Sequence, residues 1–132
     1  MLGYLLTSSA PPPPSTTVCG DNCTFVWFGQ GCFWERQWAY VNIELDEQGP
    51  FARTNSSVSS RVGYAGSLKS GANGLVCYHN NEDPTADYAA LGHAEQVRVE
   101  LDQSKQEAQF AALCDSFFAA FTVTPSGFMR PE

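Results

Sequence analysis

The predicted order of elements (strand, helix, strand, strand, helix) indicates an α+β two-layer sandwich, with helices packed on a small mixed β-sheet. Three observations support this fold class. Apolar, β-favouring residues run from Phe25 to Phe28, a strictly alternating segment spans 94–101, and apolar residues recur at helical spacing over 110–121. The 132 residues, 43% of them hydrophobic, are enough for one compact domain with one core.

Each element has a local reason in the sequence. The expected elements are a strand at 25–29, a helix from Cys32 to about Asp46, a strand at 61–66, a long loop at 67–91, a strand at 94–101 and a final helix after Ser104. Gly49 and Pro50 end the first helix. A polar, serine-rich stretch at 54–60 follows it. Loops as long as 67–91 are usually functional in compact domains.

The last strand and helix carry the clearest patterns. Val97, Val99 and Leu101 alternate with polar residues, which is typical of a half-buried strand. Ser104, with Glu107 three residues later, predicts a capping box at the start of the final helix. The apolar stripe expected on that helix consists of Phe110, Leu113, Cys114, Phe117, Phe118 and Phe121.

Two segments differ in composition. Residues 1–24 are expected to be a flexible Pro/Ser/Thr-rich leader, because Pro11–Pro14 favour an extended, solvated chain. Residues 25–132 form the expected domain. The net charge of −7 and the lack of a basic patch argue against nucleic acid and anionic membranes as partners. No apolar run approaches the roughly 20 residues that span a bilayer. A monomer is the default expectation.

The five cysteines limit the redox chemistry. Their odd number leaves at least one thiol unpaired even if disulfides form. Cys19 and Cys23 are separated by three residues and do not form the paired Cys-x2-Cys units of zinc sites, so no metal is expected. Without a clear signal peptide, reduced thiols in an intracellular setting, cytoplasmic or organellar, are the preferred interpretation.

The segment Gly29-Gln30-Gly31-Cys32-Phe33-Trp34 is the most informative motif. It predicts a strand, a glycine turn, and a cysteine that opens a helix. Unpaired backbone N–H groups and the helix dipole favour negative charge at a helix N-terminus, and the thiolate is the reactive form of cysteine. This arrangement favours an enzyme that uses Cys32 as its nucleophile.

Three ordered blocks resemble the A-type peptide methionine sulfoxide reductases. They are Gly31-Cys32-Phe33-Trp34, then Val62-Gly63-Tyr64-Ala65-Gly66, then Gly92-His93-Ala94-Glu95-Gln96-Val97. The resemblance covers roughly residues 25–121 and implies the ferredoxin-like α+β fold of that family. It also implies thiol-dependent reduction of methionine-S-sulfoxide, free or in oxidised proteins, through a sulfenic acid on the nucleophilic cysteine. Thioredoxin would restore the thiols, and no cofactor or metal would be needed.

The resemblance assigns roles by position. Cys32 is the nucleophile, and Phe33 and Trp34, together with Tyr78, form the wall that holds the substrate. Tyr64 donates a hydrogen bond to the sulfoxide oxygen. The chemistry agrees with these roles, because that oxygen gains negative character as the S–O bond breaks and a neutral O–H donor stabilises it.

Two departures from the family pattern leave alternatives open. Asn80 falls where common members carry the proton-donating Glu, so the candidate acids are His79, Asp83, Asp87 and Glu95, beside Asn80 itself. Asparagine donates hydrogen bonds but does not deliver a proton at neutral pH. The loop and the Asp87-Tyr88 pair are similar to a divergent eukaryotic and algal branch. The sequence also ends before the family's second tyrosine motif, so an incomplete C-terminus is expected.

The other thiols and polar residues have competing interpretations. The candidate resolving thiols are Cys77, Cys23 and Cys19, whereas Cys114 is expected in the core. His93 is expected to order the loop by hydrogen bonding, and Glu95 to be a satisfied, buried carboxylate. Two alternative functions remain: a sulfoxide-binding module that has lost turnover, and a peroxide-reactive thiol redox protein.

Overall fold

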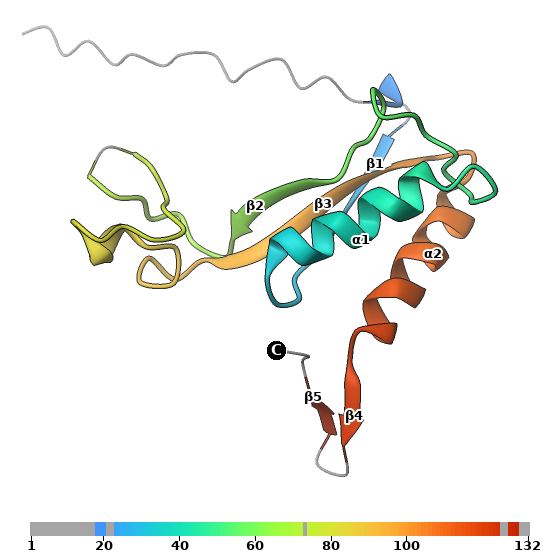
Figure 1. Ribbon diagram of the computed structural model, residues 1–132. Helices are drawn as coiled ribbons and strands as arrows, with labels where there is room; N and C mark the ends of the chain where they lie inside the picture. The colour runs from blue at the N-terminus through green and yellow to red at the C-terminus, as the bar shows by residue number, and fades with distance from the viewer. Residues whose placement is uncertain (1–17, 21–22, 73, 125–126, 130–132) are drawn as a thin grey trace, which may run out of the picture.

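The computed structural model describes residues 18–20, 23–72, 74–124 and 127–129, and it confirms the expected order of strand, helix, strand, strand, helix (Figure 1). Most of the predicted leader, 1–17, lies outside the described residues. The elements are β1 (Cys23–Phe28), α1 (Phe33–Leu45), β2 (Arg61–Ala65), the short 3-10 helix η2 (Pro84–Ala86), β3 (Ala94–Asp102), α2 (Gln106–Ala119), β4 (Thr122–Thr124) and β5 (Gly127–Met129). The sequence patterns do not predict β4 and β5, which pair with each other.

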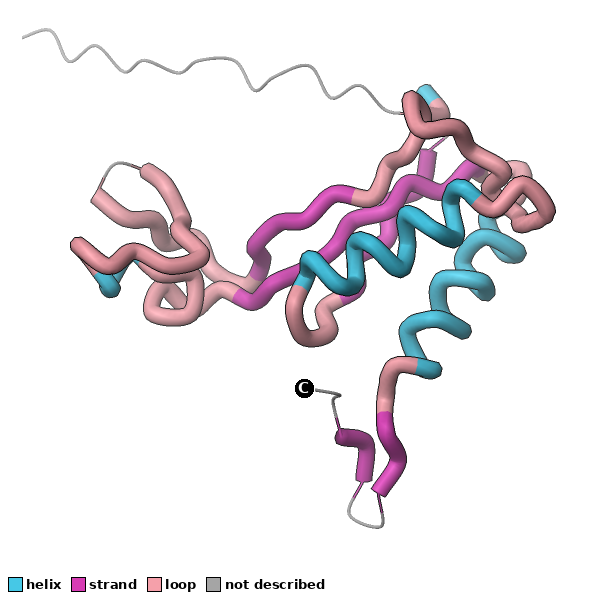
Figure 2. Tube along the Cα trace, viewed as in Figure 1, coloured by secondary structure: helices cyan, strands magenta, loops and turns pink. Residues whose placement is uncertain are grey.

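The main sheet has the order β1-β3-β2, and its strands are the neighbouring magenta segments of Figure 2. β3 is antiparallel to both neighbours. The prediction of a mixed sheet is therefore wrong for these three strands. β1 and β2 run in the same direction and are connected through α1, but β3 lies between them. Because β3 runs opposite to both of them, each of the two ladders is antiparallel. The register places Val99 opposite Val26, and Val97 opposite both Phe28 and Val62.

Both helices cover the same face of this sheet, as the two-layer prediction requires (Figure 1). Val97, Val99 and Leu101 are fully buried on that face, in agreement with their alternation in the sequence. They pack with Tyr40 of α1 and Leu113 of α2 in one hydrophobic cluster. Burial of an aliphatic side chain of this size stabilises a fold by about 1.5–3 kcal/mol, so β3 is the centre of the core.

The final helix differs from its prediction in two ways. Ser104 does not cap it; the Ser104 hydroxyl instead donates to the Asp102 carboxylate at 2.8 Å, and α2 begins at Gln106. The apolar stripe is also narrower than expected, because Phe110 and Phe118 are 45% and 60% exposed. Gln109 is buried in their place, where its side-chain oxygen accepts from the Asp102 N–H at 2.8 Å.

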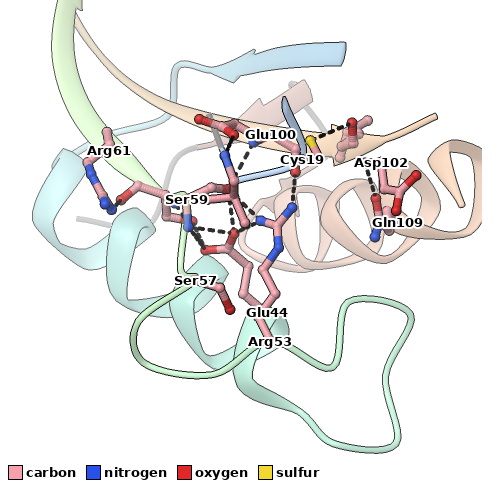
Figure 3. Close-up of polar contacts among 12 residues, drawn as sticks. Cys19, Glu44, Arg53, Ser57, Ser59, Arg61, Glu100, Asp102 and Gln109 are labelled. Carbon is pink, nitrogen blue, oxygen red and sulfur yellow. Dashed lines mark hydrogen bonds and ion pairs between the residues drawn. The ribbon is translucent and has the colours of Figure 1, made fainter. Parts of the chain in front are cut away.

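A buried carboxylate joins α1 to the sheet through the serine-rich stretch (Figure 3). Glu44 is fully buried in the last turns of α1 and accepts from the backbone N–H groups and hydroxyls of both Ser59 and Ser60. Its charge is paired with Arg53. Arg53 also donates to the Glu100 carbonyl of β3 at 2.7 Å. The stretch that looks like a polar linker in the sequence is thus partly interior.

The N-terminal end of the described chain contacts the sheet. The Val18 N–H donates to the Glu100 carboxylate at 2.6 Å, so contacts of the fold extend before Phe25. Cys19 and Cys23 form a disulfide, which corrects the expectation of reduced thiols for this pair. None of the helices among the described residues has the length and apolar character needed to cross a bilayer.

Removal of the buried carboxylate is expected to weaken the fold strongly. Glu44→Ala leaves the Arg53 guanidinium and the Ser59 and Ser60 donors without their acceptor, and breaking one half of a buried pair costs about 3–5 kcal/mol. Urea denaturation monitored by far-UV circular dichroism measures this loss. Glu47→Ala, at an exposed position just after the same helix, is the matched control. Equal unfolding free energies for the two variants would contradict the role of the network.

The Tyr40 hydroxyl is expected to oppose folding. It is buried without a hydrogen-bond partner among the described residues, and burial raises the pKa of Tyr40 from 10.0 to about 12. A raised pKa in the folded state means that stability falls as the pH rises from 10.0 to about 12. At neutral pH the free energy of unfolding of Tyr40→Phe should equal that of the wild type or exceed it by up to about 1 kcal/mol, because the substitution removes an unsatisfied hydroxyl. It should also lose less stability than the wild type in alkaline urea titrations, and an equal alkaline loss would contradict this.

Candidate active site

Cys32 lies between the glycine turn that follows β1 and the first residue of α1. Gly31 has a φ of 64°, a left-handed backbone conformation that residues with a side chain rarely adopt, and it turns the chain sharply before the helix. Cys32 is the N-cap residue of α1, with φ −67° and ψ 119°, and it is a free, half-buried thiol. The strand, glycine turn, cysteine and helix therefore follow one another as the sequence predicts.

Glu95 links β3 to the first turn of α1. Its carboxylate accepts the Phe33 N–H at 2.7 Å, which satisfies the backbone donor that directly follows Cys32. This bond confirms the expectation of a satisfied carboxylate, but the expectation of a buried one is wrong, because Glu95 is only half-buried. Glu95 lies opposite Tyr64 in the ladder between β3 and β2, so both side chains belong to the helix-covered face.

Four aromatic rings form a closed ring of contacts beside Cys32. Centroid distances are 5.5 Å from Phe33 to Tyr64, 5.2 Å from Tyr64 to Tyr88, 5.6 Å from Tyr88 to Tyr78 and 5.7 Å from Tyr78 back to Phe33. Trp34 adds an edge contact to Phe33 at 4.9 Å and is 58% exposed. We call the four members Phe33, Tyr64, Tyr78 and Tyr88 the aromatic cluster.

The three phenols of the aromatic cluster are held in their protonated form. A hydrogen bond to Glu95, with burial and the charge of Glu95, raises the pKa of Tyr88 to about 12. Burial first, and then the same carboxylate, raises the pKa of Tyr64. The charges of Glu95 and then Cys32 raise the pKa of Tyr78, and a hydrogen bond with the Cys32 thiol adds to this. All three hydroxyls therefore keep their protons at neutral pH, and the Tyr88 hydroxyl already donates its proton to the Glu95 carboxylate.

The other candidate acids mainly hold the long loop in shape. The Asp87 carboxylate accepts the Asn80 N–H at 2.6 Å and lies 3.8 Å from the exposed His79 ring. The Asn80 side-chain oxygen accepts two backbone N–H groups of the following turn. Asp83 accepts the Thr85 N–H at the start of η2. Of the candidate carboxyls, all of which lie in the described part of the chain, Glu95 contacts both the residue after Cys32 and the aromatic cluster.

The structure treats the candidate resolving thiols differently. Cys77 forms an isolated parallel β-bridge with Asp87 through the backbone. The Cys77 side chain contributes electrostatically to the raised pKa of Tyr64, so Cys77 lies near the aromatic cluster. Cys23 pairs with Asp102 at the other end of β3, seven residues from Glu95 or about 23 Å at 3.3 Å per residue. The Cys19–Cys23 disulfide is thus not brought to Cys32. Cys114 packs against the core, as expected, and burial raises the pKa of its thiol.

One group of side chains has the geometry of metal ligands. Donor atoms of Cys19, Cys23 and Glu100 lie within 4.8 Å of one another. The two sulfur atoms are bonded to each other, so they do not offer thiolates to an ion in this form. This group lies at the end of β3 remote from Cys32.

A pocket of about 430 Å³ adjoins the site. Its lining residues are Gly29, Gln30, Gly31, Tyr88, His93, Ala94, Glu95 and Phe121. Glu95 and Tyr88 belong to both the pocket and the surroundings of Cys32. The His93 ring nitrogen Nε2 lies 2.8 Å from the Lys69 carbonyl, which confirms the expectation that His93 orders the loop.

Sequence reasoning missed two residues of the site. Tyr88 completes the aromatic cluster, and the Asp87-Tyr88 pair before the block at 91–95 was the available signal. Gln30 is buried in the pocket wall, and nothing in the sequence indicates this.

Comparison with protein-family models, curated proteins and solved structures gives no match to this chain. The arrangement brings together a free thiol, three phenol hydroxyls and one carboxyl group.

Loss of the Glu95 charge is expected to lower the pKa of Tyr88. In Glu95→Gln the neutral amide no longer disfavours the phenolate, so Tyr88 should ionise nearer pH 10.0 than pH 12. The pKa values of Tyr64 and Tyr78 should fall as well, because the same charge raises them in the wild type. A spectrophotometric pH titration of the folded protein measures the change. Glu107→Gln, at an exposed position in α2, should titrate like the wild type. Identical titrations for both variants would show that Glu95 does not contact this hydroxyl.

Proposed function

We propose that this chain is a thiol-dependent reductase of methionine-S-sulfoxide, of the A-type peptide methionine sulfoxide reductase class. The observation that supports the proposal best is the free Cys32 thiol at the N-cap of α1, in contact with a cluster that contains three protonated phenols. A sulfoxide needs a soft nucleophile for its sulfur and neutral donors for its oxygen, and this site offers both.

In the proposed reaction, the Cys32 thiolate attacks the sulfoxide sulfur and forms an S–S bond, while the sulfoxide oxygen takes up one proton. The oxygen then transfers to the Cys32 sulfur, and the S–O and S–S bonds to the methionine sulfur break, which leaves a sulfenic acid on Cys32 and releases methionine as a thioether. Cysteine is thus oxidised by two electrons and the sulfoxide reduced by two. Phe33 and Trp34 hold the methyl group, and Tyr64 and Tyr78 donate to the oxygen.

Glu95 is the proposed source of the proton. Its carboxyl group is hydrogen-bonded to the Tyr88 hydroxyl, which provides a short path from the acid to the oxygen. Asp87, Asp83 and Asn80 are engaged with backbone N–H groups of their own loop, which makes them less suited to this role. His79 is exposed and pairs with Asp87.

A second thiol completes the cycle. Cys77 is the preferred resolving residue, because it lies near Tyr64, whereas Cys19 and Cys23 are bonded to each other at the far end of β3. Attack of its thiolate on the sulfenic acid gives a Cys32–Cys77 disulfide and water. Thioredoxin then reduces this disulfide, in a cytoplasmic or organellar compartment where oxidised proteins are repaired.

Cys32→Ser is expected to abolish the reaction. Reduced wild-type protein, mixed with excess methionine-S-sulfoxide peptide and no external reductant, should release about one methionine per chain, since each chain supplies one nucleophile. The variant should release none. Cys114→Ser removes a core thiol and should behave like the wild type. Retained turnover in Cys32→Ser would overturn the proposal.

The same experiment separates the proposal from its alternatives. Peptide that binds to the wild type without methionine release would favour a sulfoxide-binding module. Faster oxidation of Cys32 by hydrogen peroxide than by the sulfoxide would favour a peroxide-reactive thiol protein. Mapping the disulfide after one turnover tests Cys77, and a Cys32–Cys19 or Cys32–Cys23 bond would exclude it as the resolving residue.

A further inference from the structure

Two sulfur atoms and one carboxylate converge at the end of β3 that is remote from Cys32. The Sγ atoms of Cys19 and Cys23 and a carboxylate oxygen of Glu100 lie within 4.8 Å of one another. Glu100 is 2% exposed, and both cysteines are half-buried. Neither the proposed reaction nor the contacts of Glu44 use this carboxylate, so the group needs an explanation of its own.

The Glu100 carboxylate is oriented by groups that leave it able to bind an ion. Its Oε2 atom accepts the Val18 N–H at 2.6 Å, and its Oε1 atom lies 3.5 Å from the Arg98 guanidinium. An ionised carboxylate oxygen has two lone pairs, so Oε2 can accept this N–H and also bind a cation. Carboxylates that bind metals are usually hydrogen-bonded in this way.

The separation of Cys23 and Glu100 agrees with a zinc site. The Sγ atom of Cys23 lies 3.6 Å from the Oε2 atom of Glu100. A sulfur at about 2.3 Å and an oxygen at about 2.1 Å from a tetrahedral Zn²⁺ ion are about 3.6 Å apart. Two thiolates on one such ion are about 3.8 Å apart, so Cys19 and Cys23 can bind it together only after their S–S bond is broken.

The charges of the group point to a divalent cation. In the disulfide form, the charge of Glu100 is balanced by Arg98. Two thiolates in place of the disulfide add two negative charges beside this buried carboxylate. Buried charges are tolerated when they are paired or bind a metal. One ion of charge +2 restores neutrality to Cys19, Cys23, Glu100 and Arg98 together.

A surface pocket gives an ion access to the group. Val18, Cys19 and Asp102 are among the residues that line this pocket of about 250 Å³. The volume exceeds what one water molecule fills, so water can occupy the fourth position on the ion.

We propose that reduction of the Cys19–Cys23 disulfide creates a zinc site, in which the two thiolates and the Glu100 carboxylate bind one Zn²⁺ ion. A dithiol reductant supplies two electrons and two protons, the S–S bond breaks, and the reductant becomes a disulfide. The two thiols lose their protons as they bind the ion. Two sulfur ligands and one oxygen suit Zn²⁺ better than Mg²⁺ or Ca²⁺, which prefer oxygen, or Cu(I), which prefers sulfur.

The ion replaces the disulfide as the link at this end of the sheet, and it also joins both cysteines to β3. The disulfide alone explains the two cysteines poorly, because they are four positions apart and so short a loop gives little entropic stabilisation. The spacing of the cysteines did not predict a metal, since the third ligand, Glu100, lies 77 residues after Cys23.

Zinc binding to the reduced full-length chain tests the inference. The protein is reduced with dithiothreitol, separated from it by gel filtration without oxygen, and titrated with zinc chloride against a chromophoric chelator. The reduced wild type should bind about one ion per chain, and the disulfide form none. Cys19→Ser and Cys23→Ser should each weaken binding by at least about 100-fold, whereas Cys114→Ser should bind like the wild type. Equal affinities for all four proteins would overturn the inference.

Glu100→Gln tests the carboxylate with little risk to the fold. The amide has nearly the same shape, and its oxygen still accepts the Val18 N–H. Zinc affinity should nevertheless fall by about 10–100-fold, because the charged ligand is lost. Glu107→Gln, at an exposed position in α2, should bind zinc like the wild type. The same affinity for both variants would exclude Glu100 as a ligand and overturn the site.

Cobalt(II) in place of zinc shows which atoms bind the ion. The reduced wild type should show thiolate-to-metal charge-transfer absorbance and the visible bands of a tetrahedral ion, and Cys23→Ser should lose both. Bands that persist in Cys19→Ser and Cys23→Ser but vanish in Cys32→Ser would overturn the inference. No sulfoxide enters these experiments, so their outcome does not depend on the proposed reductase activity.

Discussion

The buried carboxylate of Glu44 is the interaction on which the rest of the fold depends. It holds the serine-rich stretch against α1, and through Arg53 it fixes the helix to the β3 backbone at Glu100. Isolated ions are costly to bury, so this group is tolerable only because several donors surround it. The network sets the position of α1 over the sheet, and α1 carries Cys32 at its first turn.

The sequence predicts those parts of the fold that local patterns determine. Alternation placed Val97, Val99 and Leu101 correctly in the core, and the glycine turn placed Cys32 before the helix. Local sequence patterns do not predict that the sheet is antiparallel, because its central strand, β3, is the last of the three in the chain and inserts between β1 and β2. The burial of Ser59 and Ser60 was hidden for a similar reason, since it follows from a carboxylate fifteen residues or more earlier.

The candidate site shows the same division. The positions of Phe33 and Tyr64 follow from motifs, whereas Tyr88 joins the aromatic cluster only because the long loop brings its ring to 5.2 Å from the ring of Tyr64. Glu95 and Glu100 lie on one strand but an odd number of residues apart, so they project to opposite faces. The start of β3 thus contributes Glu95 to the candidate site, and the end of the same strand contributes Glu100 to contacts that hold the fold.

The central place of β3 also has a consequence for how the chain is made. β1 and β2 find their ladder partner in β3, which begins at Ala94, sixty-six residues after β1 ends at Phe28. On a ribosome that adds about 5–20 residues per second, β1 waits several seconds before its partner strand has been synthesised. The Cys32 thiol emerges during this interval, ahead of the fold that will surround it, so the nascent chain is the form in which this cysteine is least protected.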